Sequence, residues 1–291
     1  MAHLLTWLSK RSLRFLHAVG AVLGWVVYAA SPSYRSRLKA NAALAGVAVA
    51  QRRASVAEAG KLVMELPRLW LRPQDQPIND PVTWQGAELI SQALDRGRGL
   101  ILLSSHMGSF EVTAQACAQW FGARQPVTVL YRPARQAWLR RLERTARDRP
   151  FLASAAASVA GVRQLMRALR QGQTLGMLPD QVPPQGLGVW APFFGRPAYT
   201  MTLATRLAQQ TDAAVLLIWA ERLPRGAGYR VVVEPLVEPL PSRAGLSEEA
   251  WSIAAATVIN RSMEALIAHK PEQYLWGYHR YKQPRSMDAG G

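Results

Sequence analysis

The residues best suited to chemistry are a histidine and a glutamate five positions apart, His106 and Glu111. They follow an apolar run typical of a buried strand, Leu100–Leu103, and ligands of open α/β sheets bind where strands end. On one helix the two side chains would point about 140° apart. They can meet only if His106 lies in a turn and Glu111 in the first turn of the next helix. Gly108 gives that turn backbone freedom, and Ser109 suits the helix N-cap.

A carboxylate beside an imidazole is a general-base arrangement, because the carboxylate fixes the imidazole tautomer and stabilises the imidazolium. The same spacing also fits a solvated His106 and a Glu111 that is merely favoured by the dipole at a helix start. The spacing alone leaves both interpretations open.

Two further polar residues follow predicted strands. Arg132 comes directly after residues 127–131, and its guanidinium suits a phosphate or a developing oxyanion; the alternative is one surface arginine among many. Asp180 follows residues 174–178 and could orient Arg132 or hydrogen-bond a sugar; otherwise it is a turn aspartate.

A fourth candidate is an aromatic loop that ends in a basic residue. Phe193 and Phe194 precede Gly195 and Arg196, and the loop could line an apolar groove for an acyl chain. A packed loop corner explains the same residues equally well.

The elements that must position these residues alternate between strand and helix. This alternation predicts an α/β/α sandwich around a largely parallel sheet. Residues 73–81 are rich in Pro, Asp and Asn and predict a surface loop. Strands are expected at 100–103, 127–131, 174–178, 215–220 and 229–234, and helices at 34–72, 110–121, 135–147, 159–170, 200–210 and 247–269.

Composition narrows the class of partner. The 291 residues carry a formal net charge of +16 with 49% hydrophobic residues, which excludes a disordered chain and implies an anionic partner such as nucleic acid, phosphate or an acidic membrane. Residues 1–57 hold eight basic side chains and no acidic one, since the first carboxylate is Glu58. The single Cys117 excludes an intrachain disulfide, and its apolar surroundings favour a buried structural thiol.

The N-terminal region contains an apolar stretch, 13–30, with basic clusters on both sides. Its length is close to the short limit for a transmembrane helix, so a membrane-anchoring helix, spanning or half-buried, is expected. A buried amphipathic helix and a cleaved signal peptide are the alternatives. The larger basic excess follows the stretch and favours a cytoplasmic main domain. The predicted organisation is an anchor with its basic flank at 1–57, a catalytic domain at 58–284 and a frayed tail at 285–291.

Read together, these motifs resemble one family, the late acyltransferases of bacterial lipid A biosynthesis (lauroyl and myristoyl transferases). That family belongs to the lysophospholipid acyltransferase superfamily, whose signature is His, four residues, then Asp or Glu. One departure is the segment around His279 and Arg280, where family members more often have His-Arg-Arg-Phe, so a structural cap is expected there. The resemblance rests on His106…Glu111, 131–133, 176–181, 192–198, 271–276 and 279–282.

The resemblance implies transfer of a fatty acyl chain from acyl carrier protein to a hydroxyl of a lipid A precursor at the bacterial inner membrane, on its cytoplasmic face. His106 would deprotonate the hydroxyl with support from Glu111, and no covalent acyl-enzyme would form. Arg132 would contact acceptor phosphate or stabilise negative charge, Asp180 would help to order that site, and Gly195 and Arg196 would bind substrate. No metal or tightly held cofactor is implied, and membrane lipids are expected partners.

Two alternatives stay open. One is an acyltransferase that acts on another glycolipid, a phospholipid or an ornithine lipid, with acyl-CoA or acyl carrier protein as donor. The other is a non-enzymatic basic protein that binds membranes or nucleic acid. No base-reading or strand-reading motif is visible in the sequence, and the basic residues concentrate beside an apolar stretch, which argues against nucleic acid.

Overall fold

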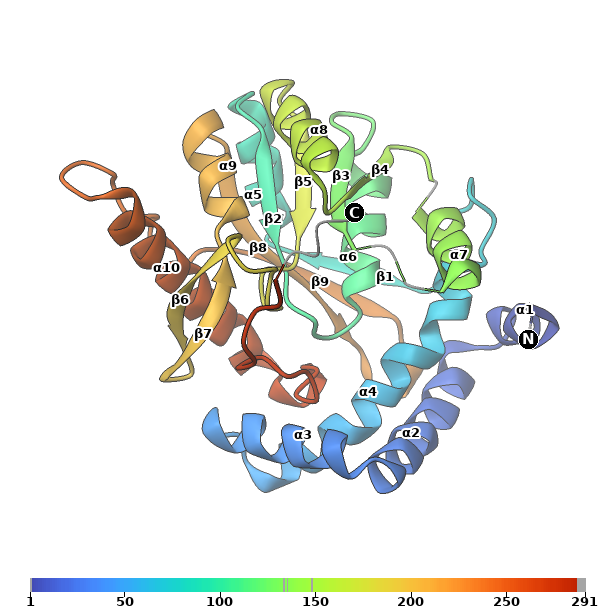
Figure 1. The fold of residues 1–291 in the computed structure, drawn as a ribbon. Helices are drawn as coiled ribbons and strands as arrows, with labels where there is room; N and C mark the ends of the chain where they lie inside the picture. Colours follow the sequence, from blue (N-terminus) through green and yellow to red (C-terminus); the bar gives the residue numbers. More distant parts are fainter. Residues whose placement is uncertain (1, 133, 135, 148, 287–291) are drawn as a thin grey trace.

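The computed structural model describes residues 2–132, 134, 136–147 and 149–286 and is built around a seven-stranded sheet (Figure 1). The sheet order is β1-β9-β8-β2-β5-β3-β4, and a separate two-stranded hairpin joins β6 to β7. The strands of the sheet and the hairpin are β1 (Val82–Gln85), β2 (Leu100–Leu103), β3 (Val127–Tyr131), β4 (Leu152–Ala156), β5 (Thr174–Met177), β6 (Gly188–Phe193), β7 (Arg196–Met201), β8 (Ala214–Arg222) and β9 (Tyr229–Pro235).

The helices occupy the connections and the N-terminus. They are α1 (Ala2–Ser9), α2 (Leu13–Ala30), α3 (Pro32–Leu44), α4 (Val49–Trp70), α5 (Ala87–Asp95), α6 (Phe110–Phe121), α7 (Ala137–Arg147), α8 (Val159–Arg170), α9 (Leu203–Thr211) and α10 (Glu248–His269), with short 3-10 helices at Pro224–Gly226 and Pro271–Gln273.

The strands at the centre of the sheet are parallel, as expected. Strand β2 pairs in parallel with β5 and β8, and Leu103 lies opposite Met177 and Leu217. Only the β8–β9 pair is antiparallel within this sheet. Because parallel neighbours end at the same edge, the segments after β2 and β5 are brought together there.

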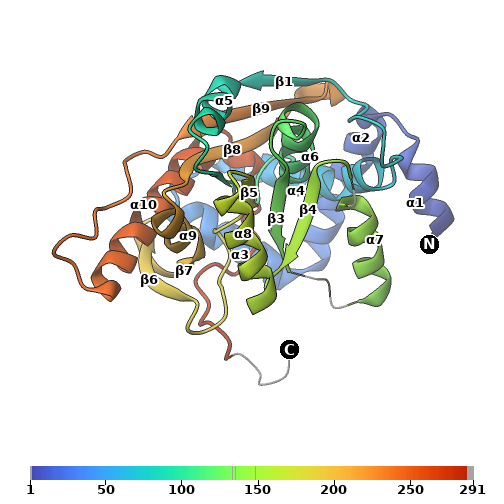
Figure 2. The ribbon, with the colours of Figure 1, turned by 90° about the horizontal axis from the view of Figure 1, so that it is seen from above.

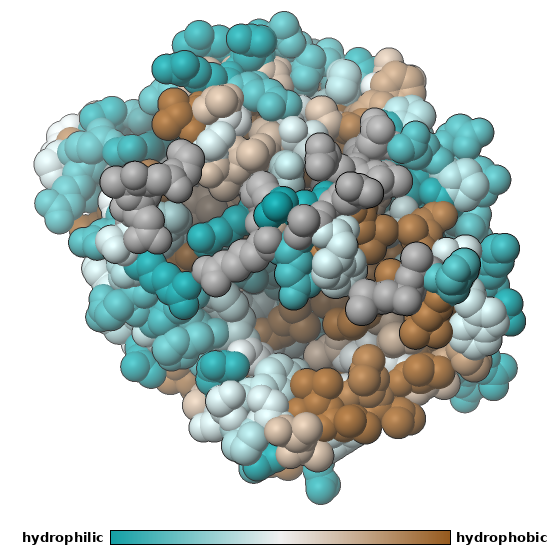
Figure 3. Space-filling view, turned by 45° about the vertical axis from the view of Figure 1, so that its right-hand side comes forward, coloured by the Kyte–Doolittle hydropathy of each residue, from teal (hydrophilic) through white to brown (hydrophobic). Residues whose placement is uncertain are grey.

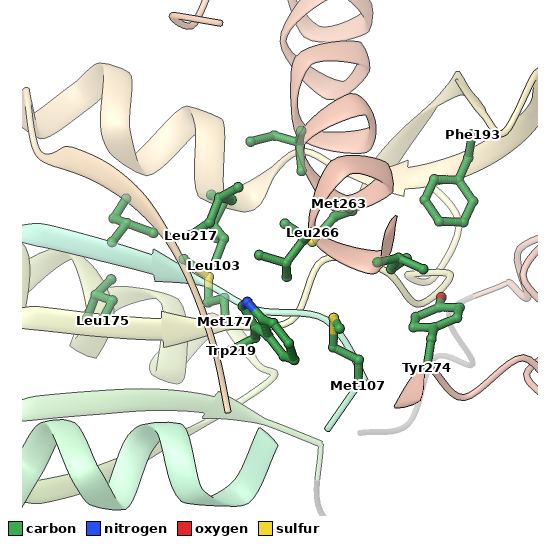
Figure 4. Close-up of a cluster of buried hydrophobic side chains, with 14 of the residues drawn as sticks. Leu103, Met107, Leu175, Met177, Phe193, Leu217, Trp219, Met263, Leu266 and Tyr274 are labelled. Atoms are coloured by element: carbon green, nitrogen blue, oxygen red, sulfur yellow. The ribbon is translucent and has the colours of Figure 1, made fainter. Parts of the chain in front are cut away.

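Both faces of the sheet are covered, which confirms the α/β/α sandwich (Figure 2). Successive side chains of a strand point to opposite faces, so Ile101 and Leu103 pack in one core with α8, α9 and α10. Leu100 and Leu102 pack in the other core with α5, α6 and the end of α4. The first core continues past the sheet to Met107 and Tyr274, which lie next to each other in Figure 4.

The N-terminal helices pack on the domain instead of standing apart from it. Helix α2 crosses α4 where three glycines meet: a Cβ on Gly60 would lie 1.9 Å from the carbonyl oxygen of Gly20, and one on Gly24 would lie 2.1 Å from that of Val56. Within the described chain, α2 is the one helix whose length and composition would allow it to cross a membrane. The expected boundary after residue 57 falls inside α4.

Several sequence-based boundaries were wrong. The expected helix over 34–72 is two helices, because the chain turns at Ala45–Ala48 with Gly46 at φ +68°. The second of them, α4, includes Pro67 and ends at Trp70, two residues before the expected end. The expected helix over 200–210 begins later, since β7 extends to Met201. Strands β1, β4, β6 and β7 and helix α5 were not predicted, and Arg135 lies outside the described residues.

Candidate active site

His106 lies in the turn after β2 and is held by a carboxylate that follows the neighbouring strand, β5. Its Nδ1 lies 2.7 Å from Oδ1 of Asp180, and its backbone N–H donates to Oδ2 of Asp180 at 2.9 Å. The strand pairing explains the contact, because β2 and β5 end side by side. The side chain of Asp180 is 1% exposed while that of His106 is 21% exposed, so the imidazole reaches the surface and its carboxylate partner does not.

The second ring nitrogen is the one available for chemistry. With Nδ1–H donated to Asp180, Nε2 of His106 carries the lone pair, and Nε2 of Gln181 lies 3.0 Å from it. The Phe110 ring packs against the imidazole with 5.1 Å between centroids. If a substrate hydroxyl takes the place of the Gln181 amide, Nε2 of His106 can accept the proton of that hydroxyl.

The Asp180 carboxylate is ionised. Burial by itself would raise its pKa, but the positive charge of His106 in its imidazolium form, two hydrogen bonds from that residue and the charge of Arg280 lower the pKa below its ordinary value. The pKa of Tyr274 is raised well above its ordinary value by burial and by the charge of Asp180. A buried anion on Nδ1 fixes the imidazole tautomer and stabilises the imidazolium.

Glu111 lies in the first turn of α6, as expected, and its Oε2 accepts a hydrogen bond of 3.1 Å from Nε1 of Trp70 on α4. The expected pairing is therefore corrected in one respect: the carboxylate that holds Nδ1 of His106 is Asp180. Asp180 also faces this histidine in place of the expected Arg132 or sugar. The part of Glu111 in catalysis stays a prediction.

The loop between β2 and α6 requires Gly108. Its φ is +54°, and a Cβ would lie 2.0 Å from the carbonyl oxygen of Ala220. Its N–H donates to the carbonyl of Gln273 at 2.9 Å, and Leu275 N–H donates to the carbonyl of His106 at 3.0 Å. Ser109 occupies the N-cap position of α6, as expected, although its hydroxyl makes no capping hydrogen bond.

The other predicted residues lie around this loop without joining the His106–Asp180 pair. Arg132 follows β3 at the same sheet edge and is exposed. Gly195 lies in the β6–β7 turn with Phe194, and Arg196 begins β7, where its guanidinium lies 5.0 Å from the ring centre of Tyr281. From this turn a run of aromatic contacts leads back toward the histidine loop: Phe194–Trp276 at 5.8 Å and Trp276–Tyr274 at 4.7 Å between ring centroids.

Comparison with known proteins assigns the chain to a family. The model of the family described as bacterial lipid A biosynthesis acyltransferase matches residues 2–283. The chain belongs to this family.

Among relatives of this acyltransferase-family protein is the lipid A biosynthesis palmitoleoyltransferase of Escherichia coli (strain K12), 26% identical over 224 residues, which are 77% of this chain and 68% of the relative. The lipid A biosynthesis lauroyltransferase of the same organism is 26% identical over 227 residues, 77% of this chain and 69% of the relative. A lipid A biosynthesis acyltransferase of Haemophilus influenzae is 24% identical over 191 residues, 66% of this chain and 56% of the relative.

A buried ionic network that was not predicted from the sequence lies behind the histidine loop of this acyltransferase-family protein. Arg222 at the end of β8 donates to Glu65 at 2.9 Å, to Glu58 at 2.8 Å and to the carbonyl of Gly108 at 2.9 Å. Nε2 of His17 on α2 lies 3.2 Å from Glu65 Oε2. Burial would raise the pKa of Glu65, but Arg222 and His17 lower it overall. The sequence held one signal of this network: Glu65 is a carboxylate within the otherwise apolar stretch 62–66, which indicates a buried charge that needs a partner.

Arg280 has a structural place in the acyltransferase-family fold. It is 2% exposed and donates to the carbonyl of Tyr199 at 2.7 Å and to Oγ1 of Thr200 at 2.8 Å, which supports the expected cap; His279 beside it is exposed. Across the described residues, no group of three or more His, Cys, Asp or Glu side chains is placed to hold a metal ion.

Proposed function

We propose that this protein transfers a fatty acyl chain from acyl carrier protein to a hydroxyl of a lipid A precursor, with His106 as general base. The hydrogen bond between Nδ1 of His106 and the buried Asp180 carries this proposal, because it leaves Nε2 as the basic nitrogen at the carboxyl edge of the sheet. The family of the chain supports the substrate class.

In the proposed reaction the acceptor hydroxyl displaces the amide of Gln181 and gives its proton to Nε2 of His106. The hydroxyl oxygen then forms a bond to the thioester carbonyl carbon. As the tetrahedral intermediate collapses, the carbon–sulfur bond breaks and the thiolate takes the proton back from the imidazolium. Atoms balance without a covalent acyl-enzyme, a metal or a cofactor. Asp180 stabilises the transient imidazolium, and Glu111 supports the histidine from the start of α6.

Basic residues at the same sheet edge suit the anionic substrates. Arg132 is exposed beyond β3, where its guanidinium would bind acceptor phosphate or the developing oxyanion. The turn that contains Gly195 and Arg196 would contribute a further substrate contact. Helix α7 follows Arg132 in the chain, and its exposed Arg140 would meet acceptor phosphate or the acidic carrier protein.

We place the protein on the bacterial inner membrane with its catalytic domain in the cytoplasm. Residues 1–57 supply the anchor and residues 58–284 the catalytic domain. The glycine contacts between α2 and α4, and the buried His17–Glu65 pair, favour a half-buried α2 over a spanning one. Pulling α2 away from the domain would leave Glu65 without one of its partners. The opposite side of α2 is exposed and apolar, as in Val22 and Val26, and suits the lipid interface.

The test is acyl transfer by the purified protein with acyl carrier protein thioester and a phosphorylated lipid A precursor, followed by mass spectrometry of the lipid. His106→Ala is expected to lose about 10²–10⁴-fold in rate. His269→Ala is the matched control, because that exposed histidine on α10 pairs with Glu234. An H106A variant with most of its activity would refute the mechanism. Product only with acyl-CoA, or only with another lipid acceptor, would refute the proposed substrates.

A further inference from the structure

An open pocket of about 470 Å³ lies between α2, α3 and α4, outside the candidate active site. Its lining combines two kinds of side chain. The apolar and aromatic ones come from all three helices, and the basic ones come from α3 and the start of α4. The lining is Trp25, Tyr28, Leu38, Val49 and Val56 together with Lys39, Arg52 and Arg53.

The basic side chains of this pocket lack anionic partners in the part of the chain that the structure describes. Among the described residues no salt bridge joins Lys39, Arg52 or Arg53 to a carboxylate, and Nε of Arg52 is buried without a hydrogen-bond partner. The first carboxylate of the chain, Glu58, is occupied by Lys61 and Arg222. Positive charge concentrated in a pocket without counter-charge indicates an external anion.

The start of α4 increases this positive potential. Ala48 stands at the N-cap and provides no side-chain hydrogen bond, and the first turn contains no acidic residue. A helix N-terminus carries a partial positive charge, so Arg52 and Arg53 so close to it are electrostatically unfavourable in the empty pocket. An anion held between Arg52 and Arg53 would neutralise their charge and would also interact favourably with the positive end of α4.

The surface next to the pocket shows which anion fits. Trp25 is shared between the pocket and the exposed apolar side of α2, where Val22, Val26 and Val27 are also exposed. Figure 3 shows hydrophobic side chains gathered at the lower edge of the molecule, where Figure 1 places the N-terminal helices. A free phosphate or a nucleic acid would use the charge and leave this apolar lining unsatisfied. An anionic phospholipid would use both, and Trp and Tyr favour the membrane interface.

We infer that the pocket between α2, α3 and α4 binds the phosphate headgroup of an anionic phospholipid while the apolar side of α2 lies in the acyl region of the same leaflet. Arg52, Arg53 and Lys39 bind the phosphate. Trp25 and Tyr28 contact the adjoining glycerol and the first methylene groups. The pocket therefore selects the lipid surface on which the protein rests, separately from the site that contains His106.

The test measures binding of the full-length protein to vesicles by flotation, without acyl donor, so its outcome is independent of acyl transfer. Vesicles are phosphatidylcholine alone or phosphatidylcholine mixed with phosphatidylglycerol. The R52Q/R53Q variant is expected to bind the mixed vesicles about tenfold or more weakly and pure phosphatidylcholine unchanged. The R163Q/R167Q variant removes the same charge from the exposed side of α8 and is expected to change either affinity less than about twofold.

Equal losses in both variants would overturn the inference, because they would indicate attraction by net charge alone. Unchanged binding in R52Q/R53Q would overturn it as well. Inorganic phosphate is expected to release the protein no better than chloride at equal ionic strength. Release by phosphate alone, dependent on Arg52 and Arg53, would assign the pocket to a free anion instead. Thermal unfolding of R52Q/R53Q is expected at or above the native temperature, since α4 loses an unfavourable charge at its N-terminus.

Discussion

The guanidinium of Arg222 donates a hydrogen bond of 2.9 Å to the carbonyl oxygen of Gly108, two residues beyond His106. The same group is bound to Glu65 and Glu58 of α4. Burial would lower the pKa of Arg222, but these carboxylates raise it, so the cation is retained. One buried charge thus joins the histidine loop to the helix on which α2 packs.

Arg222→Met is therefore expected to destabilise the protein by about 3–5 kcal/mol, because it leaves the fully buried Glu65 without its guanidinium. The measurement is denaturant unfolding in detergent, followed by tryptophan fluorescence. The double variant R222M/E65L is expected to recover most of the loss, since an apolar pair replaces the ion pair. A single variant within about 1 kcal/mol of native, or a double variant no better than the single one, would contradict this account.

Asp180→Asn tests which carboxylate supports the histidine. The amide keeps the shape of the side chain but cannot stabilise an imidazolium, so kcat is expected to fall about 10²–10⁴-fold with a smaller change in KM. Glu111→Gln is the comparison, because Glu111 bonds Trp70 while Asp180 bonds both the ring and the backbone of His106. A larger loss of kcat in E111Q than in D180N would return the supporting role to Glu111.

Acid stability follows from the same carboxylate. The pKa of Asp180 is lowered in the folded protein, because the charge and hydrogen bonds of His106 outweigh the effect of burial. The unfolded chain therefore binds more protons than the native one between the folded pKa and the ordinary value of about 3.9. The stability from Asp180 is complete above that value and is lost as pH falls through the folded pKa.

The free energy of unfolding is accordingly expected to fall below about pH 4, and to fall less steeply in D180N. Denaturant midpoints measured from neutral to acidic pH give the two slopes. Parallel curves for the native and D180N proteins would show that Asp180 is not the group that titrates.

The structural elements that depend on a local sequence pattern could be predicted from the sequence. Leu100–Leu103 is apolar throughout because both faces of β2 are covered, and all four residues are buried. The positions of His106 in a turn and of Glu111 in the first helical turn could be predicted because both residues closely follow this strand in the sequence. The β6–β7 hairpin was missed because Pro192 and Pro197 lie opposite each other within it, and proline argues against a strand.

What could not be predicted depends on strand order. Asp180 reaches His106 because β5 lies beside β2, although 74 residues separate them. Glu65 meets Arg222 across 157 residues. No spacing rule connects such pairs, since the sheet order that brings them together arises from packing of the whole domain.

The contact between α2 and α4 gives the last prediction. Gly60→Ala would normally stabilise a helix by about 0.5–1 kcal/mol. Here its Cβ would lie 1.9 Å from the carbonyl oxygen of Gly20, so the helices must separate, and a net loss of about 1–3 kcal/mol is expected. Ala54→Ser, on the exposed side of the same helix, is the control and is expected to stay within about 0.5 kcal/mol of native. Denaturant unfolding measures both, and a G60A protein more stable than the native one would show that α2 does not pack on α4 in solution.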